Sequence, residues 1–481
     1  MLFNSTTFLI FLFIVFVVFR KTSEISAHWA NFVLLAGSYI FYGWWDWRFL
    51  ILIVISSATD FFIGKEIFKS NNQSKRKLLL ITSIAINLGM LFFFKYFNFF
   101  IDSFKTVFAP FTSTEQWSTL NIILPVGISF YTFQTLSYTI DIYNRKTEPT
   151  VSALTFFTFV AFFPQLVAGP IERARNLIPQ FEKLRDFSYS QAVSGLKLIL
   201  WGLFKKMVIA DQLAEIVNTV YASPVNFNGW EIVLATFLFG FQIYCDFSGY
   251  SDIAIGTARL FGIELMTNFR TPYFSVSFRE FWHRWHISLS TWFRDYVYIP
   301  LGGNKNSSIK WLRNIIITFL VSGLWHGANI TFLIWGGIHG VLFAVEHFIS
   351  PIFKLNKKIK NVAGLFITFI AVNFAWLFFR AENWNHVKNL LNRIFAPQTE
   401  NLNSIIDILT SSGSLTPPGR MLLFIFPIFI LIELFIGKND FTSLLNNSPK
   451  FIRWGFYYVI LLAVLFFGVL DSAPEFIYFQ F

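Results

Sequence analysis

Long apolar runs recur along the whole chain and limit what it can fold into. A helix needs roughly 17 to 25 residues to cross the hydrocarbon core of a bilayer. Runs that approach or reach this length occupy residues 2–19, 30–45, 49–63, 78–94, 120–138, 154–167, 230–244, 315–330, 332–348, 362–379, 421–436 and 456–470. With 55% hydrophobic and only 14% charged residues, the 481-residue chain has too little polar surface to coat a soluble globule. We therefore expect an all-α polytopic membrane protein.

Cysteine usage and charge exclude several other classes of protein. Cys245 is the single cysteine, so the chain can form no intramolecular disulfide and has no CxxC motif for a metal or for redox chemistry. The formal charge of +11 comes from residues that flank the apolar runs, without the basic stripe that binds nucleic acid. The first run lacks a preceding basic segment and a following cleavage site, which predicts a retained helix and not a signal peptide.

Basic residues gather at every second junction between the first apolar runs. These junctions hold Arg20 and Lys21, then Lys65, Lys69, Lys75, Arg76 and Lys77, then Arg145 and Lys146. Near the other end, Lys438, Lys450 and Arg453 share one loop, while the final tail carries only the acids Asp471 and Glu475. Because short basic loops stay in the cytoplasm, both termini are expected on the extracytoplasmic side.

The middle of the chain departs from this regular pattern. Between residues 246 and 310, charged residues mix with aromatic residues and glycines, which a lipid-facing helix would not tolerate. We expect short helices and re-entrant turns around a protein-enclosed cavity. The apolar stretch 192–209 contains Lys197, Lys205 and Lys206, so it either spans the membrane or lies partly in the interface. Apolar residues at helical spacing predict an amphipathic interfacial helix over residues 383–395.

Two histidines lie inside apolar sequence near residue 330. His326 stands in the segment SGLWHGANITFLIWGGIHG, residues 322–340, and His339 follows thirteen residues later. A histidine in a membrane segment is costly, and its ordinary pKa suits proton transfer near neutrality. For His326, catalysis and a structural bond to a backbone carbonyl both remain open, whereas a structural role is favoured for His339.

A second group of polar residues lies in the segment FWHRWHISLSTWFRDYVYIPLGGN, residues 281–304. His283 and His286 are three residues apart, which on one helix would place both on one face, but no third metal ligand follows at a recognisable spacing. We therefore expect no bound metal. Arg284, Arg294 and Asp295 can bind anionic groups of a substrate or pair with one another, and internal pairing is the commoner outcome.

The segment YCDFSGYSDIAIG, residues 244–256, places two acids beside glycine and serine. Asp246 and Asp252 could bind a cation, orient a histidine or cap the ends of broken helices, and capping is favoured. Ser248 and Ser251 do not stand in a GxSxG motif, so a serine-hydrolase site is not indicated.

The two histidine segments resemble the membrane-bound O-acyltransferase family, in particular its bacterial branch of alginate O-acetyltransferase-like members. Further matching segments are LPVGISFYTFQTLSYTIDIY from Leu124, FFPQLVAGPIERA from Phe162, GLKLILWGLFKKMVIAD from Gly195, DFSGYSDIAIG from Asp246 and the terminal EFIYFQF. The resemblance covers essentially the whole chain. It implies one integral-membrane domain over residues 1–481, with a catalytic core at 120–350 and C-terminal helices at 360–481. Such a domain is a helical bundle with re-entrant segments around a central tunnel.

The resemblance also implies which residues act. His326 matches the essential histidine of the family and is expected to be the general base, with a transient acyl-histidine left open. His286 matches the second active-site position and is expected to orient a substrate or to donate a hydrogen bond to the developing oxyanion. The weaker candidates for substrate binding are Arg284, Arg294, Asp295, Asp246, Trp325 and Asn329.

The function implied by the resemblance is transfer of an acetyl group from acetyl-CoA in the cytoplasm toward O-acetylation of an extracytoplasmic polysaccharide. No bound cofactor and no nucleic acid are expected. An extracytoplasmic acetyltransferase partner is expected to dock at the loop 397–419 or at the C-terminal tail. The membrane would be the bacterial inner membrane. Alternatives are a D-alanyl transferase of teichoic acid that uses an acyl carrier protein, a transporter, and a scaffold of a polysaccharide-export complex.

Overall fold

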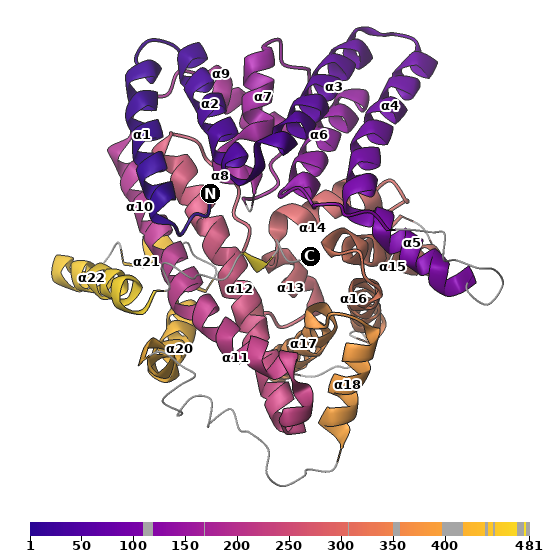
Figure 1. The fold of residues 1–481 in the computed structure, drawn as a ribbon, viewed down its shortest axis with the longest axis vertical. Helices are drawn as coiled ribbons and strands as arrows, with labels where there is room; N and C mark the ends of the chain where they lie inside the picture. Colours follow the sequence, from indigo (N-terminus) through magenta and orange to yellow (C-terminus); the bar gives the residue numbers. More distant parts are fainter. Residues whose placement is uncertain are drawn as a thin grey trace. The chain divides into compact units, whose positions relative to one another are not determined.

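A computed structural model describes residues 1–108, 119–167, 169–305, 307–349, 356–396, 417–437, 441–445, 448–468 and 476–477. Within these ranges every regular element is a helix and no strand occurs, so the expected all-α class is confirmed (Figure 1). Most of the predicted docking loop 397–419 and most of the C-terminal tail lie outside the described residues. Phe476 and Ile477 of the tail are described, and both are buried, so these two residues do not form an exposed docking surface.

The chain divides into two compact units, whose boundary falls within α10 and within α12. One unit comprises residues 1–196 and 254–266. Its helices are α1 (Thr6–Ser23), α2 (Ala27–Asp46), α3 (Leu50–Lys69), α4 (Gln73–Leu91), α5 (Phe97–Phe108), α6 (Ile128–Tyr143), α7 (Ala153–Ala161), α8 (Phe163–Leu166), α9 (Ala174–Glu182), the start of α10 (Tyr189–Leu203) and the end of α12 (Gly229–Leu260).

The other unit comprises residues 197–253 and 267–481. Besides the remainder of α10 and α12, it contains the π-helical segment η3 (Phe204–Ala210), α11 (Asp211–Ala222), α13 (Phe278–Arg284), α14 (Ile287–Phe293), the π-helical segment η6 (Arg294–Tyr298), α15 (Ser308–His326), α16 (Ile330–Ile349), α17 (Lys357–Arg380), α18 (Trp384–Phe395), α20 (Pro417–Ile436), α21 (Phe441–Leu444) and α22 (Lys450–Phe467).

Among the described residues, seven continuous helical stretches are long and apolar enough to cross a membrane. They are Thr6–Ser23, Ala27–Lys69, Gln73–Lys105, Gly229–Leu260, Ile330–Ile349, Lys357–Arg380 and Lys450–Phe467. The stretch Ala27–Lys69 contains two helices, α2 and α3, joined by one 3-10 turn, as the two apolar runs in this region predict. The chain is therefore a multi-pass membrane protein.

Among the described residues, four of the twelve apolar runs do not give one of these seven stretches: 120–138, 154–167, 315–330 and 421–436. The run 154–167 is divided into α7 and α8, and the nine residues of α7 rise only about 14 Å. The run 120–138 becomes helical only at Ile128, after Gly127 in a left-handed conformation with φ 75°. Fourteen of the sixteen residues of α6 are buried, many of them serine and threonine. Protein therefore surrounds α6 and most of α7 and α8, whereas Leu120 and Ile123 at the start of the first run are exposed.

The segment 246–310 matches the prediction only in its second part. Residues 246–260 continue α12 without a break, so irregular backbone was wrongly expected there. A continuous helix in this place is possible because its acids are paired with buried lysines, as described below. After residue 267 the chain forms the short helices α13, α14 and η6, as expected. The predicted helix over 383–395 is also present, as α18.

Helices α15 and α16 cross at two glycines. A Cβ atom at Gly323 would lie 2.2 Å from the carbonyl oxygen of Phe332, and one at Gly336 would lie 2.3 Å from that of Phe319. Small residues that let two helix backbones touch are a typical way to pack helices in membranes. His326 follows Gly323 by three residues, so this contact holds the histidine against α16.

The glycine contact predicts that Gly323→Ala destabilises the protein. The added methyl group meets backbone atoms that cannot move aside, and overpacking of this kind costs about 1–3 kcal/mol. The measurement is thermal unfolding of the purified protein. Gly337→Ala is the matched control, because its Cβ would lie 3.7 Å from the Leu320 side chain, an ordinary contact. Equal melting temperatures for the two variants would show that the close approach is not required.

Candidate active site

His326 is the last residue of α15 and lies among aromatic rings. Its side chain is 3% exposed. Its imidazole ring packs edge-on against Trp325, Trp335 and Phe379, with ring centroids 4.8, 5.0 and 5.3 Å apart. The helix ends here because Gly327 is extended, at φ −164°. A Cβ at Gly327 would lie 2.1 Å from the Phe332 ring, so only glycine allows the chain to leave α15 at this point.

His286 lies between α13 and α14 and is held by Asn268. It adopts a left-handed conformation, φ 42° and ψ 55°, and its side chain is fully buried. The imidazole Nδ1 lies 3.0 Å from the Asn268 side-chain oxygen, which also accepts a hydrogen bond from the Ser288 hydroxyl. The Ile287 amide donates to the Asn268 carbonyl at 2.9 Å, and the Asn268 side-chain amide donates to Ser251 of α12. These bonds fix both the backbone and the ring of His286.

The hydrogen bond to Asn268 determines the tautomer of His286. An amide oxygen only accepts hydrogen bonds, so Nδ1 must carry the proton. Burial lowers the pKa of His286 to about 3, so the ring is neutral at physiological pH. In this state Nε2 carries a lone pair and accepts hydrogen bonds.

Trp325 brings the two histidines into one cluster. Its ring centroid lies 6.0 Å from that of His286 and 4.8 Å from that of His326. Phe247 of α12 packs edge-on against His286 with ring centroids 4.6 Å apart. The structure therefore places both predicted catalytic residues, and Trp325 with them, in one aromatic site within one unit of the chain.

A cavity of about 100 Å³ lies beside this site. It is lined by Trp282, Leu289, Ser290, Phe293, Thr318, Phe319 and Ser322. Ser322 precedes His326 by one helical turn, and Leu289 and Ser290 belong to the first turn after His286. Neither histidine lines the cavity itself, and its mainly apolar lining suits a small hydrophobic group.

Asp246 belongs to a buried ion-pair network. Its carboxylate lies 2.8 Å from the ammonium group of Lys206, which also pairs with Asp211 at 2.8 Å. The second carboxylate oxygen of Asp246 accepts a hydrogen bond from the Ile477 amide. The α10 and α12 backbones can approach this closely because a Cβ at Gly202 would lie 2.5 Å from the Gly249 carbonyl oxygen. Asp246 thus stabilises the packing of α12, and its position there indicates a structural role.

Asp252, nearly two turns further along α12, has a similar partner. Its carboxylate lies 2.6 Å from the ammonium group of Lys205, which also donates to the Ser248 hydroxyl at 2.9 Å. Both acids therefore bind a cation supplied by the protein itself. The expectation that they cap broken helices is wrong, since both lie inside the continuous helix α12.

The other candidates for substrate binding are mostly engaged with neighbouring residues. Arg284 pairs with Glu280 of the same helix, and Arg294 pairs with Asp295 at 2.8 Å. The structure does not bring these three residues into the aromatic cluster by any contact that it shows among the described residues. Asn329 caps the start of α16 by accepting a hydrogen bond from the Thr331 amide.

The geometry needed for a metal site on His283 and His286 is absent. Helix α13 ends at Arg284, so the two histidines do not share a helix face. The His283 ring is exposed and contacts the Arg279 carbonyl of its own helix. In the part of the chain that the structure describes, no group of three or more histidine, cysteine or acidic residues could hold a metal ion.

Sequence reasoning missed Asn268, Phe247 and the buried pair Phe476–Ile477. Phe476 packs against Phe247, with ring centroids 5.6 Å apart, and Phe247 packs against His286. Asn268 precedes His286 by eighteen residues and carries no motif of its own. The available signals were the segments DFSGYSDIAIG and EFIYFQF, which contain Phe247 and Phe476 and were matched to the family without a role for either residue.

The network around Lys206 predicts that Asp246→Asn lowers stability. The substitution removes one of the two carboxylates that pair with Lys206 and the charged acceptor of the Ile477 amide, while Asp211 still pairs with Lys206. The expected loss is therefore smaller than the loss of about 3–5 kcal/mol that follows when a buried charge loses its sole partner.

Glu66→Gln is the control, since Glu66 and its partners Lys69 and Lys75 have side chains 48, 71 and 55% exposed, and such surface pairs contribute about 0–1 kcal/mol. Chemical denaturation in detergent would measure both. Unchanged stability of the Asp246 variant would contradict the structural role.

Comparisons with known proteins identify the family of the chain. The profile of the membrane-bound O-acyltransferase family matches residues 145–383. The chain is 38% identical to the probable alginate O-acetylase AlgI of Pseudomonas aeruginosa over 84% of this chain and 77% of that protein. It is 32% identical to the peptidoglycan O-acetyltransferase of Helicobacter pylori over 93% and 91%. Its identity to the teichoic acid D-alanyltransferase of Bacillus subtilis is 27%, over 55% and 71%. The chain therefore belongs to the membrane-bound O-acyltransferase family and is an O-acyltransferase.

Proposed function

We propose that this protein moves an acetyl group from acetyl-CoA in the cytoplasm across the membrane, toward O-acetylation of an extracytoplasmic polysaccharide. The observation that carries the proposal is that the Trp325 ring contacts both His286 and His326. Two relatives named for O-acetylation, of alginate and of peptidoglycan, are more similar to this chain than the D-alanyltransferase is. This similarity supports acetyl as the transferred group.

An acyl thioester is already activated, so the protein needs chiefly a base and groups that stabilise the developing oxyanion. In the proposed reaction, His326 removes the proton of the acceptor hydroxyl as its oxygen attacks the thioester carbonyl. The tetrahedral intermediate then collapses with release of the CoA thiolate, which takes up a proton. The dry aromatic surroundings of His326 strengthen the electrostatic interactions of this step.

For His286, the tautomer favours one of the two roles expected from the sequence. With Nδ1–H bonded to Asn268, the neutral ring has no second proton to donate to an oxyanion. Its Nε2 lone pair can accept a hydrogen bond from a hydroxyl group. We therefore assign His286 to orienting the acceptor hydroxyl, and no oxyanion donor is assigned to it.

The cavity beside the histidines supports a small acyl group. At about 100 Å³ it is smaller than the cavity of about 150 Å³ that suffices for benzene in a protein core. An acetyl group fits a space of this size, and its methyl group gains from the mainly apolar lining.

The setting of the reaction follows from the charge distribution. The positive junctions support a bacterial inner-membrane location with both termini extracytoplasmic. Transfer to a polysaccharide outside the membrane would be completed by an extracytoplasmic acetyltransferase partner. The names of the relatives support two classes of acceptor. One is an exopolysaccharide such as alginate, and the other is peptidoglycan.

The proposal predicts that His326→Ala abolishes O-acetylation while the protein remains in the membrane. Loss of a general base lowers the rate roughly 10²- to 10⁴-fold. The measurement is the O-acetyl content of fractionated envelope and secreted glycans in a deletion strain that carries each variant at equal membrane level. His283→Ala is the matched control, because this nearby histidine is exposed and its Nδ1 contacts the Arg279 carbonyl of its own helix.

The same strains separate the proposal from its alternatives. Restoration by wild type and by His283→Ala, but not by His326→Ala, supports catalysis at His326, and the acetylated fraction identifies the acceptor. Equal restoration by His326→Ala would contradict the general base and favour a scaffold or transporter. D-Alanine esters on teichoic acid in place of acetyl groups would identify a carrier-protein-dependent D-alanyl transferase.

A further inference from the structure

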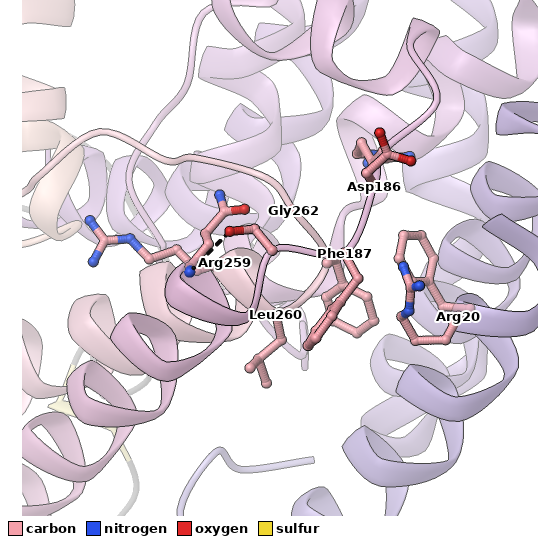
Figure 2. Close-up of a pocket in the computed structure, with 11 residues that line it drawn as sticks. Arg20, Asp186, Phe187, Arg259, Leu260 and Gly262 are labelled. Atoms are coloured by element: carbon pink, nitrogen blue, oxygen red, sulfur yellow. Dashed lines mark hydrogen bonds between the residues drawn. The ribbon is translucent and has the colours of Figure 1, made fainter. Parts of the chain in front are cut away.

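A small basic pocket lies in the unit formed by residues 1–196 and 254–266, which does not contain His286 or His326 (Figure 2). It is enclosed by the end of α1, the loop 183–188, the first turn of α10 and residues 259–262 after α12. Gly262 has φ 72° and packs against the aliphatic part of Arg185, with a Cβ position 3.5 Å from the Arg185 Cβ. This left-handed glycine lets the chain turn beneath the arginine.

Arg185 lines this pocket beside an exposed acid, Asp186, with which it makes no ion pair. One guanidinium nitrogen donates to the Asn31 side chain at 2.9 Å, and the group lies over the rings of Phe19 and Phe181. The other terminal nitrogen, Nη1, is buried and has no hydrogen-bond partner among the described residues. Among the described residues, the Arg185 guanidinium group also makes no ion pair. Burial lowers the pKa of Arg185 to about 10, which leaves it charged but incompletely satisfied.

Arg20 supplies a second cation to the pocket. Figure 2 shows its side chain extending from α1 toward Phe187, whose ring centroid lies 5.0 Å from the guanidinium carbon. Its acidic neighbour is Glu24, 3.8 Å away and largely exposed, so this pairing is weak. Arg20 therefore remains able to bind an anion.

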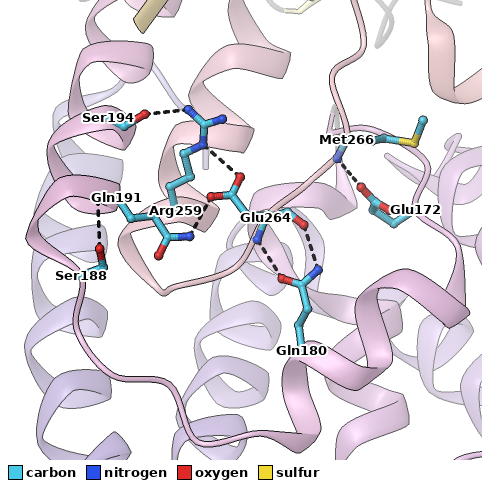
Figure 3. Close-up of polar contacts among 8 residues, drawn as sticks. All are labelled: Glu172, Gln180, Ser188, Gln191, Ser194, Arg259, Glu264 and Met266. Atoms are coloured by element: carbon cyan, nitrogen blue, oxygen red, sulfur yellow. Dashed lines mark hydrogen bonds and ion pairs between the residues drawn. The ribbon is translucent and has the colours of Figure 1, made fainter. Parts of the chain in front are cut away.

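Arg259 contributes only the base of its side chain. Its guanidinium group turns away from the pocket toward Glu264 and Ser194 (Figure 3). Glu264 also accepts a hydrogen bond from the Gln191 side chain. Its backbone amide donates to the Gln180 side-chain oxygen, and its carbonyl accepts from the Gln180 side-chain amide. These contacts hold the wall of the pocket in place independently of Arg20 and Arg185.

The surroundings of the pocket are those of a membrane interface. The adjoining loop exposes Leu184, Phe187 and Tyr189, with exposed fractions of 65, 46 and 75%. Helix α1, which ends at the pocket, exposes large apolar side chains along its length: Leu9, Ile10, Phe13, Ile14 and Val18. Exposed apolar helices face lipid tails, and aromatic residues beside arginines are typical of the headgroup region.

We propose that this pocket binds the phosphate group of an anionic phospholipid, with Arg185 and Arg20 as its ligands. The volume of about 10 Å³ admits one oxygen the size of a water molecule, so a phosphoryl oxygen enters and a nucleotide does not. The acyl chains then lie along the exposed face of α1. Basic pockets between membrane helices bind lipid headgroups in this way, and the basic end of α1 is expected at the anionic cytoplasmic leaflet.

The test measures lipid binding by the full-length protein purified in a neutral detergent. Melting temperature and lipid retention in native mass spectrometry are recorded with added phosphatidylglycerol, phosphatidylcholine or inorganic phosphate. Arg185→Gln and Arg20→Gln should each weaken phosphatidylglycerol binding about fivefold, the ratio that corresponds to about 1 kcal/mol per basic residue at an anionic surface. Lys183→Gln is the matched control, since this exposed residue of the same loop does not line the pocket.

Each outcome decides the proposal. Stabilisation of wild type and Lys183→Gln by phosphatidylglycerol, reduced in both arginine variants, supports it. Equal binding by wild type and the arginine variants would place the lipid elsewhere and overturn it. If inorganic phosphate alone gave the whole shift, the ligand would be free phosphate and not a lipid. If Arg185→Gln fails to fold, the phosphatidylglycerol binding of Arg20→Gln decides the proposal. These readouts are independent of acyl transfer, so they stand or fall separately from the proposed function.

Discussion

The direct backbone contact of α15 with α16 is the constraint on which the site depends. Lipid tails are as apolar as leucine, so burying apolar side chains gives membrane helices little reason to associate. Gly323 and Gly336 instead let the helix backbones touch, and any side chain at either position would collide with a carbonyl oxygen. Because His326 lies one turn beyond Gly323, the contact also fixes the imidazole against Trp335.

Buried polar contacts fix the remainder of the site on α12. Lys206 holds Asp246, and Asn268 links Ser251 to His286. Phe247, the residue after Asp246, packs against His286. Unpaired, each of these polar groups would cost several kcal/mol in a medium of low dielectric constant. Paired, they allow few alternative arrangements, which gives the two histidines one defined geometry.

The sequence was sufficient for the helical class, for most of the long helices and for both histidines, because apolar length and short motifs are local properties. It was insufficient where a residue depends on a distant partner. Asp246, for example, was expected to cap a helix. Its partner Lys206 could not be predicted, because it lies forty residues earlier and no local pattern links the two residues. The run 154–167 looked like a membrane span because burial in protein and burial in lipid select the same residues. His283 and His286 were compared as neighbours on a helix, but α13 ends between them.

The central claim is that His286 and His326 act as one unit around Trp325. A double-mutant cycle tests it most directly, with acyl-transfer rates measured for wild type, His286→Ala, His326→Ala and the double variant at equal protein levels. Residues that act together show strongly non-additive losses. The account predicts that the acyl-transfer rate of the double variant is within a few fold of the rate of the slower single variant. Losses that multiply would show that the two histidines act independently and would contradict the account.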